Sequence, residues 1–258
     1  MIGQPRTLQA REILESDRVW SAYALADLAA DEQAQCTWLV GARSVVLLYA
    51  GFQPPVLFAH GDPGECRELL QALPVGPVMI TLRQEVLAAF SSRLVLTDPV
   101  PMWRMSLQAG GLVPALGEGT QRLGPADLDA IQALFAGQAD RPDAFHPRQL
   151  DSGVFYGIWA GAQLVCVAGT HVVSPELDVA ALGNVFTLPS LRARGLATRA
   201  TAAVVDELRR LGLTTIVLNV AQDNTPAIRC YHRLGFREHC PYVEGIGRLH
   251  QPADDRLE

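Results

Sequence analysis

The sequence predicts a mixed α/β fold, with helices on both faces of a mixed β-sheet. Three observations support this prediction. Apolar runs are of strand length, as at residues 44–50; a helical spacing of apolar residues begins at Leu196, Ala200 and Val204; and 49% of the 258 residues are hydrophobic while 19% are charged. Strands that alternate with helices after an antiparallel start are typical of such a sheet.

The first half of the chain is expected to form one small α/β unit. A helix before Gln35 precedes three strands, and another helix begins after Asp62, which can cap it with Glu65 as the reaching carboxylate of a capping box. Pro63 suits the first turn of that helix. The strands are expected at residues 37–40, 45–49, 55–60 and 77–82.

A stretch rich in Gly and Pro at residues 110–120 lacks hydrophobic periodicity and separates the two patterned regions. We therefore expect two domains, at residues 1–112 and 119–258. The similar order of elements in both halves suggests an ancestral duplication.

The second half is expected to carry strands and helices in the order βββαβαβ, after a first helix. Apolar alternation, turn residues and helical spacing place them in sequence. The expected elements are a helix at 125–135, strands at 153–159, 163–172 and 179–186, a helix from Leu196, a strand at 214–220, a helix at 226–234, and a strand or hairpin at 236–244.

Composition excludes several classes of function. The net charge of −6 argues against binding to nucleic acid or to an acidic membrane surface, and no apolar run is long enough for a transmembrane helix. The N-terminus lacks a secretory pattern, so we expect a cytoplasmic protein. The five cysteines have neither CxxC nor zinc-finger spacing, so we expect free thiols and no metal. A monomer and a homodimer both remain open.

The segment Thr187–Thr198, TLPSLRARGLAT, places two arginines and a glycine where a strand becomes a helix. A helix N-terminus carries unpaired N–H groups and partial positive charge, so Arg192 and Arg194 are unfavourable there unless an anion binds. A phosphate group is the anion that such a site holds best. The segment is not an NTPase P-loop, because Gly-Lys-Ser/Thr is missing and the chain has no lysine.

Two blocks of sequence together resemble the GNAT N-acetyltransferase superfamily. The Arg192-x-x-Gly195-x-Ala197 spacing is similar to its acyl-coenzyme A signature. The second block, which ends at Gly235-Phe236, resembles its Asn-x-x-Ala-x-x-x-Tyr-x-x-x-Gly-Phe signature. The resemblance covers residues 120–245 and implies tandem GNAT-like domains, the first of them degenerate.

The resemblance implies an enzyme that uses acetyl-coenzyme A, without a metal, to acylate an amine, and the expected acceptor is a small-molecule amine. The loop would hold the diphosphate, and a backbone N–H near Val185 or Phe186 would polarise the thioester carbonyl. The residues implied to contact the cofactor are Val185, Phe186, Thr187, Arg192, Ala193, Arg194, Gly195, Leu196, Ala197, Thr198, Asn219, Asn224, Ala227 and Tyr231.

Tyr231 is the implied catalytic residue. A phenol ordinarily keeps its proton at neutral pH, so it suits protonation of the departing thiolate. Asn224 also fits a helix cap, and Asn219 fits a bond to neighbouring backbone. Cys166 and Cys230 have no base partner in the sequence, so direct attack by the amine is expected rather than an acyl-enzyme.

The TLPSLRARGL run most resembles the glycine N-acyltransferase-like branch, although glycine as acceptor is not supported. That branch has a glutamate, proposed as general base, where this chain has Ala181. The remaining candidate bases are His171, Glu176, Asp178 and Glu244. Two other functions remain open: a coenzyme A-binding module without catalysis, and acetylation of a protein N-terminus or lysine.

Overall fold

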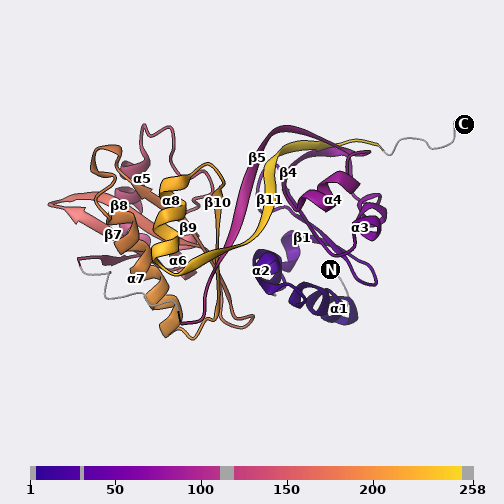
Figure 1. Cartoon of the computed structure of the whole chain (residues 1–258), viewed down its shortest axis with the longest axis horizontal. Helices are drawn as coiled ribbons and strands as arrows, with labels where there is room; N and C mark the ends of the chain where they lie inside the picture. The colour runs from indigo at the N-terminus through magenta and orange to yellow at the C-terminus, as the bar shows by residue number, and fades with distance from the viewer. Residues whose placement is uncertain (1–3, 30–31, 111–118, 252–258) are drawn as a thin grey trace, which may run out of the picture. The chain divides into compact units, whose positions relative to one another are not determined.

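The structure is a computed structural model that describes residues 4–29, 32–110 and 119–251 (Figure 1). The chain divides into two compact units, Met1–Arg104 with Cys240–Glu258, and Met105–His239. The predicted boundary at 112–119 falls almost entirely outside the described residues and stays a prediction. The division differs from that prediction at the C-terminus, because the chain from Cys240 onward belongs to the first unit.

The first unit contains a sheet with strand order β1-β2-β3-β4-β11-β5. Strands β1 to β3 pair antiparallel, β3 and β4 pair parallel, and β4 pairs antiparallel with β11. The long strands β5 and β11 each begin in one unit and end in the other. The elements are α1 (Gln4–Glu15), α2 (Arg18–Ala26), η1 (Gln33–Gln35), β1 (Cys36–Val40), β2 (Val45–Tyr49), β3 (Val56–His60), α3 (Pro63–Leu70), β4 (Gly76–Leu82), α4 (Gln84–Ala89), β5 (Leu94–Leu107) and β11 (Phe236–Leu249).

The start of α3 confirms one predicted cap and corrects another. The Asp62 carboxylate accepts a hydrogen bond from Glu65 N at 3.0 Å, so Asp62 caps the helix as predicted. The Glu65 carboxylate does not turn back to complete a capping box. It accepts from the backbone N–H groups of Ala42 and Arg43 (2.5 and 3.0 Å), and so holds the turn between β1 and β2.

The second unit contains the strand order β10-β9-β8-β7-β6. Strands β6 to β9 pair antiparallel and β9 pairs parallel with β10, so the predicted mixed α/β fold is confirmed. The elements are β6 (Gln121–Leu123), η2 (Pro125–Asp127), α5 (Leu128–Phe135), α6 (Gln149–Ser152), β7 (Phe155–Ala160), β8 (Gln163–Ser174), β9 (Val179–Thr187), η3 (Pro189–Leu191), α7 (Leu196–Arg210), β10 (Thr215–Ala221) and α8 (Thr225–Arg233).

The core of the second unit places helices on both faces of its sheet. Phe155 of β7, Val167 of β8 and Phe186 of β9 pack with the apolar side of α5 on one face. Cys166 precedes Val167, so its side chain points to the other face. There its thiol lies near Cys230 of α8 and Arg199 of α7. The α7 and α8 ribbons lie side by side in Figure 1. In the described part of the chain no helix is long and apolar enough to cross a membrane.

Asp27, after α2, predicts a measurable pH dependence of stability. Burial, with a smaller contribution from the Glu32 carboxylate, raises the pKa of Asp27 from 3.8 to about 8. A carboxyl group with a raised pKa in the folded state binds its proton more tightly there than in the unfolded chain. Its stabilising contribution is therefore complete below about pH 4 and is lost as the pH rises through 8.

We expect Asp27→Asn to remove this dependence. The variant should gain free energy of unfolding relative to the parent protein by about 4 kcal/mol between pH 5 and pH 8.5, since about three units of the pKa shift take effect over that range and each unit corresponds to about 1.4 kcal/mol. Urea unfolding at both pH values measures the difference. Asp223→Asn, at an exposed position, is the control. If the free energy of unfolding changed equally with pH in Asp27→Asn and in the parent protein, the prediction would be contradicted.

Candidate functional site

Strands β9 and β10 part before either of them ends. Their parallel ladder runs from Val179↔Thr215 to Leu182↔Leu218. Strand β9 then continues to Thr187 and β10 to Ala221. Backbone groups of β9 beyond Leu182 that face β10 therefore lie past the last ladder pair, where an extended ligand can take hydrogen bonds from them.

Two bulges lie beside the point where β9 and β10 part. One adds a residue to β9 and the other adds a residue to β8, so together they restore the register of the pair. Between the pairs Val167↔Phe186 and Gly169↔Gly183, β9 advances three residues while β8 advances two. The extra residue lies in Asn184–Val185, and Asn184 has a left-handed φ of 54°. A bulge of this kind re-aims backbone groups, which suits the predicted N–H donor near Val185.

The second bulge restores the register on β8. Between Thr170↔Leu182 and Val172↔Ala181, β8 advances two residues while β9 advances one, so His171 is the extra residue. Neither bulge is predicted from the sequence, because β8 and β9 carry mostly apolar residues on both faces, so that a one-residue shift leaves little trace in the pattern. Glycines inside strands, such as Gly169 and Gly183, are the signal that could have revealed them.

The loop before α7 forms a concave group of backbone N–H donors. Ala193 and Gly195 both have left-handed φ values, of 61° and 76°, on either side of Arg194. Gly195 is the N-cap of α7, whose first turn holds no acidic residue. Such alternating backbone conformations and a helix N-terminus both favour a bound anion. The predicted loop residues from Arg192 to Thr198 therefore form a candidate anion-binding site.

The two arginines of the loop differ, although the sequence analysis treated them alike. Arg192 donates from Nε to Thr187 O (3.1 Å) and from a terminal nitrogen to Asp140 Oδ2 (2.6 Å), and its guanidinium lies 5.5 Å from the centre of the Phe186 ring. Arg194 is exposed. Arg194 is therefore the more available cation for an arriving anion.

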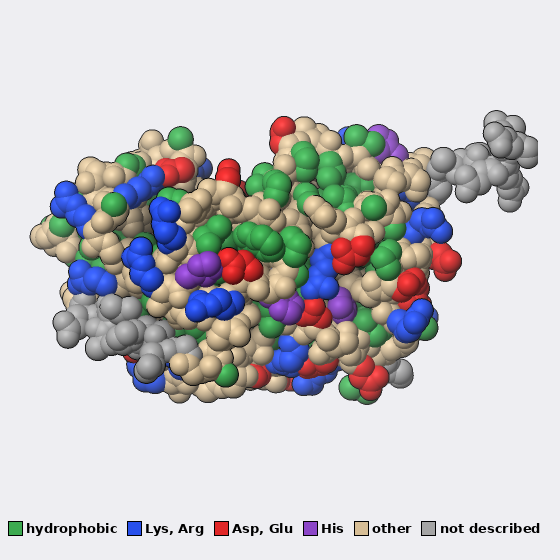
Figure 2. Space-filling view, in the orientation of Figure 1, with side chains coloured by type: hydrophobic (Ala, Val, Ile, Leu, Met, Phe, Trp, Pro, Cys, Tyr) green, Lys and Arg blue, Asp and Glu red, His purple; other side chains and the backbone are tan. Residues whose placement is uncertain are grey.

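Basic side chains gather on the part of the surface over α7 and α8 (Figure 2). All of them are arginines, because the chain has no lysine. Arg194, Arg229 and Arg233 are exposed in this region. The local positive charge contrasts with the net charge of −6 and suits a small anion rather than a long polyanion.

Helix α8 brings the second motif to the first. The Asn224 side chain accepts a hydrogen bond from Ala227 N at 3.2 Å, so the predicted cap is confirmed. Thr198 Oγ1 in the first turn of α7 lies 3.1 Å from Cys230 Sγ. Tyr231 follows Cys230, is 8% exposed, and packs edge-on against Phe236 at 6.1 Å between ring centres. The structure therefore joins two blocks that lie about 30 residues apart in sequence.

Some residues predicted to contact coenzyme A could do so only through their backbone groups, because their side chains are buried in the protein. The side chains of Phe186 and Thr187 are buried, Phe186 in the core on the α5 face and Thr187 with Oγ1 3.1 Å from Cys166 Sγ. Asn219 is half-buried on β10, one residue past the ladder. Burial raises the pKa of the Cys166 thiol to about 11, which makes it a poor nucleophile at neutral pH.

The candidate bases lie in different places. Asp178 precedes β9 and binds Thr214 N through Oδ1 at 2.6 Å. Asp178 lies seven positions before Val185, a distance of about 23 Å along an extended strand at 3.3 Å per residue. Glu176 is exposed in the same turn. Glu244 belongs to the first unit, where it accepts from Tyr242 at 2.6 Å. Only His171 lies beside the parting of β9 and β10.

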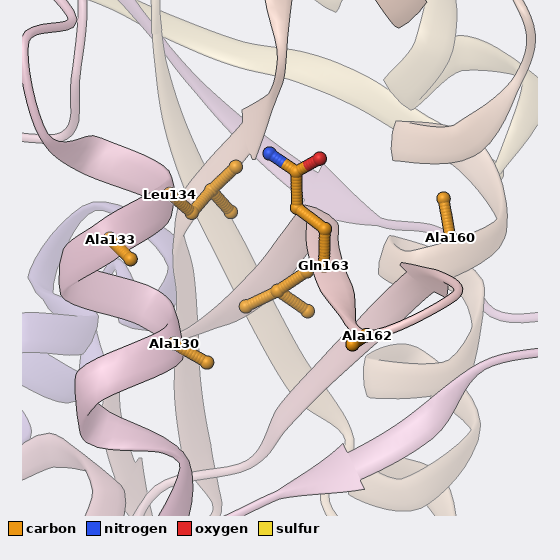
Figure 3. A pocket seen from close by; sticks show the side chains of 7 residues that line it. Ala130, Ala133, Leu134, Ala160, Ala162 and Gln163 are labelled. Carbon is orange, nitrogen blue, oxygen red and sulfur yellow. The ribbon is translucent and has the colours of Figure 1, made fainter.

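A hollow of about 410 Å³ lies between α5 and the β7–β8 turn (Figure 3). None of its lining side chains is titratable. None of the predicted site residues lines it. The lining residues are Ala130, Ala133, Leu134, Ala160, Ala162, Gln163 and Leu164. Among the residues that the structure describes, no group of three or more His, Cys, Asp or Glu side chains could hold a metal ion.

Comparisons with known proteins agree with this geometry. Residues 128–236 match the model of the acetyltransferase (GNAT) family. A mycothiol acetyltransferase of Geodermatophilus obscurus is 30% identical over 212 residues, which cover 74% of this chain and 62% of that protein. A [ribosomal protein bS18]-alanine N-acetyltransferase of Salmonella typhimurium is 37% identical over 79 residues, covering 31% of this chain and 51% of that protein.

Among solved structures, a GNAT-family putative acetyltransferase from Novosphingobium aromaticivorans matches with a TM-score of 0.61 at 22% identity. The match covers 87% of this chain and 96% of that one, so the likeness of fold extends over both units. The chain spans less than two thirds of the length of the curated relatives described above. The signatures and the parting strands lie within or beside residues 128–236, the segment that matches the acetyltransferase (GNAT) family model.

Proposed function

We propose that this protein is an N-acetyltransferase that moves an acetyl group from coenzyme A to a primary amine. One observation carries the proposal: the loop before α7 follows the open edge of β9, and Thr198 after the loop contacts Cys230, the neighbour of the buried Tyr231. Acetyl-coenzyme A would supply the acyl group as an activated thioester. The N–H groups of the loop would hold its diphosphate, and the open edge of β9 would bind its extended arm.

The chain's own residues provide the remaining chemistry. The bulge at Asn184–Val185 turns backbone N–H groups away from the β8 ladder, so that one can polarise the thioester carbonyl. The Tyr231 phenol is proposed to donate its proton to the departing sulfur. The burial of Cys166 supports direct attack by the amine rather than acyl transfer through a thiol.

A small-molecule amine is the proposed acceptor. The mycothiol acetyltransferase resembles 74% of this chain, and so its likeness reaches both units, whereas the alanine N-acetyltransferase resembles 31%. The second candidate, an N-terminal alanine of a protein, rests on that shorter but closer likeness. The glycine N-acyltransferase-like branch rests on the TLPSLRARGL run alone. A cytoplasmic location also remains a proposal, as does the choice between monomer and homodimer.

Thiol release from acetyl-coenzyme A tests the proposed reaction. The full chain is incubated with non-acetylated mycothiol, amino sugars, polyamines and a peptide that begins with alanine. We expect release of the coenzyme A thiol with at least one small amine. Binding of coenzyme A by calorimetry without thiol release on any amine would favour a non-catalytic binding module. A response to the peptide alone would favour the protein acetyltransferase.

Replacement of Arg194 tests the diphosphate site. We expect Arg194→Ala to weaken coenzyme A binding about 10- to 100-fold, since a charge-assisted hydrogen bond is worth about 1.5–3 kcal/mol. Arg192→Ala should have the smaller effect, because Thr187 O and Asp140 already engage its guanidinium. Calorimetry measures both. Arg210→Ala, at an exposed position in the last turn of α7, is the control. Unchanged affinity in Arg194→Ala would contradict this site.

A further inference from the structure

The three strands beside the candidate site carry very few titratable side chains. Strands β9 and β10 have none, and β8 has only Cys166 and His171. The Cys166 side chain lies on the sheet face toward α7 and α8, and burial raises the pKa of its thiol to about 11. A base that acts from these strands at neutral pH can therefore only be His171.

The imidazole of His171 packs directly against the backbone of β9 at Gly183. A Cβ placed on Gly183 would lie 2.1 Å from Nε2 of His171, so the ring occupies the space that a side chain at position 183 would need. Gly183 is the first residue of β9 after its last ladder pair with β10, Leu182↔Leu218. The ring therefore lies at the level where the two strands part.

The bulge at His171 explains how a residue of β8 reaches this position. By alternation along β8 the His171 side chain lies on the same face as position 169, and the bulge places this unpaired residue beside β9. Gly183 pairs with Gly169, where a Cβ would meet the Phe155 ring of the α5 face. Directly paired residues share a face. The imidazole therefore lies on the α5 face, opposite to Cys166.

The neighbouring bulge lies on the same side. Asn184 Nδ2 donates to Gln149 Oε1 of α6 at 2.9 Å, so the first residue of α6 lies beside the bulge of β9. The methyl group of Ala181 precedes Gly183 by two residues and shares its face. Along β9 this face offers a methyl group and a glycine, and the imidazole of His171 lies against that glycine.

We propose that His171 is the general base that takes a proton from the acceptor amine; this rests on the proposed function. As the amine nitrogen forms its bond to the acyl carbon and the carbon–sulfur bond breaks, the amine proton passes to the imidazole. The sulfur receives the Tyr231 phenol proton. Tyr231 recovers a proton, and His171 releases one, by exchange with solvent. The products are the amide and the free thiol, so atoms and charge balance.

Two substitutions of His171 test the proposal in the full chain. With saturating acetyl-coenzyme A and the amine that gives the fastest thiol release, we expect kcat to fall about 100-fold in His171→Ala and His171→Gln. The KM for acetyl-coenzyme A should stay within threefold. Added imidazole should restore part of the kcat of His171→Ala, which a purely structural role would not allow. The control is His232→Ala, whose side chain is exposed and pairs with Glu238.

Gly183→Ala tests the position of the His171 imidazole and leaves the imidazole itself unchanged. Gly183 lies outside the left-handed region, so alanine is tolerated by the backbone there. We expect Gly183→Ala to lower kcat when His171 is present, because the new methyl displaces the ring. In the His171→Ala background the same substitution should change little. Such non-additivity is the mark of two positions that act through one contact.

The outcomes separate the two proposals. If the parent protein releases no thiol with any amine, the proposed function fails. If the parent protein is active and His171→Ala keeps kcat within threefold, the role of His171 fails alone. A low kcat that imidazole does not restore, together with a lowered melting temperature in both His171 variants, would assign His171 to structure and also overturn the proposal. Loss of kcat in His146→Gln with none in His171→Gln would move the base to the segment before α6.

Discussion

Tyr231→Phe is expected to lower kcat for thiol release by about 100-fold or more, equivalent to about 3 kcal/mol of transition-state stabilisation. The substitution removes one hydroxyl from a ring that is 8% exposed and packed against Phe236. The packing of the ring is kept, so the KM for acetyl-coenzyme A should change little. A fall in kcat alone identifies a group that acts in the chemical step.

Tyr156→Phe is the matched control for this experiment. Tyr156 is a half-buried tyrosine of β7 whose hydroxyl lies 3.4 Å from Glu207. Its loss should leave kcat within twofold. Steady-state thiol release at saturating acetyl-coenzyme A measures both variants. If Tyr231→Phe keeps more than a third of the parent kcat, another group protonates the sulfur.

Phe155→Ala is expected to have the largest effect on stability. The Phe155 ring is fully buried, contacts the Phe145 ring at 6.2 Å between centres, and lies over the backbone of Gly169. Truncation of a buried phenylalanine costs about 3–5 kcal/mol, through lost apolar burial and the cavity that remains. The cavity would open beside the strands that carry the candidate site.

Trp159 allows the unfolding of the second unit to be followed separately. It is the one tryptophan among residues 105–239, because the other three belong to the first unit. Fluorine NMR of protein labelled with fluorotryptophan resolves its signal during urea unfolding. Phe52→Ala, at a 37% exposed position, is the control and should cost less than about 1 kcal/mol. A loss below 1 kcal/mol in Phe155→Ala would contradict the packing described above.

Local signals in the sequence were enough to predict most elements of the second unit. Residues 163–172 alternate, Asn224 caps α8, and Gly195 opens α7, each through an interaction within a few residues. The two motifs gave the candidate site because they are local as well. Only the resemblance to a family predicted that the two motifs form one site. The contact between Thr198 and Cys230 that joins them is seen in the structure.

Features that depend on distant residues could not be predicted. The pairing of β11 with β4, as in Val243↔Leu82, joins segments about 160 residues apart and leaves no periodic trace in either one. The ion pair of Arg192 with Asp140 spans 52 residues. The bulge at His171 shifts the pairing register of β8 with β9, but it does not change the residue composition of either strand. These contacts decide which arginine is available and where the imidazole lies.

The C-terminal part of β11 has a consequence for any attempt to divide the protein. A chain cut near residue 118 would leave Val243–Leu249 on the C-terminal fragment, although these residues pair with β4 of the N-terminal fragment. The two fragments should therefore remain associated and copurify through seven backbone pairs, from Val243↔Leu82 to Leu249↔Gly76. Fragment 119–258 produced alone would present that length of β11 without β4, as an open edge prone to aggregation. Complementation between separately expressed halves is thus the practical route to exchanging one unit for another.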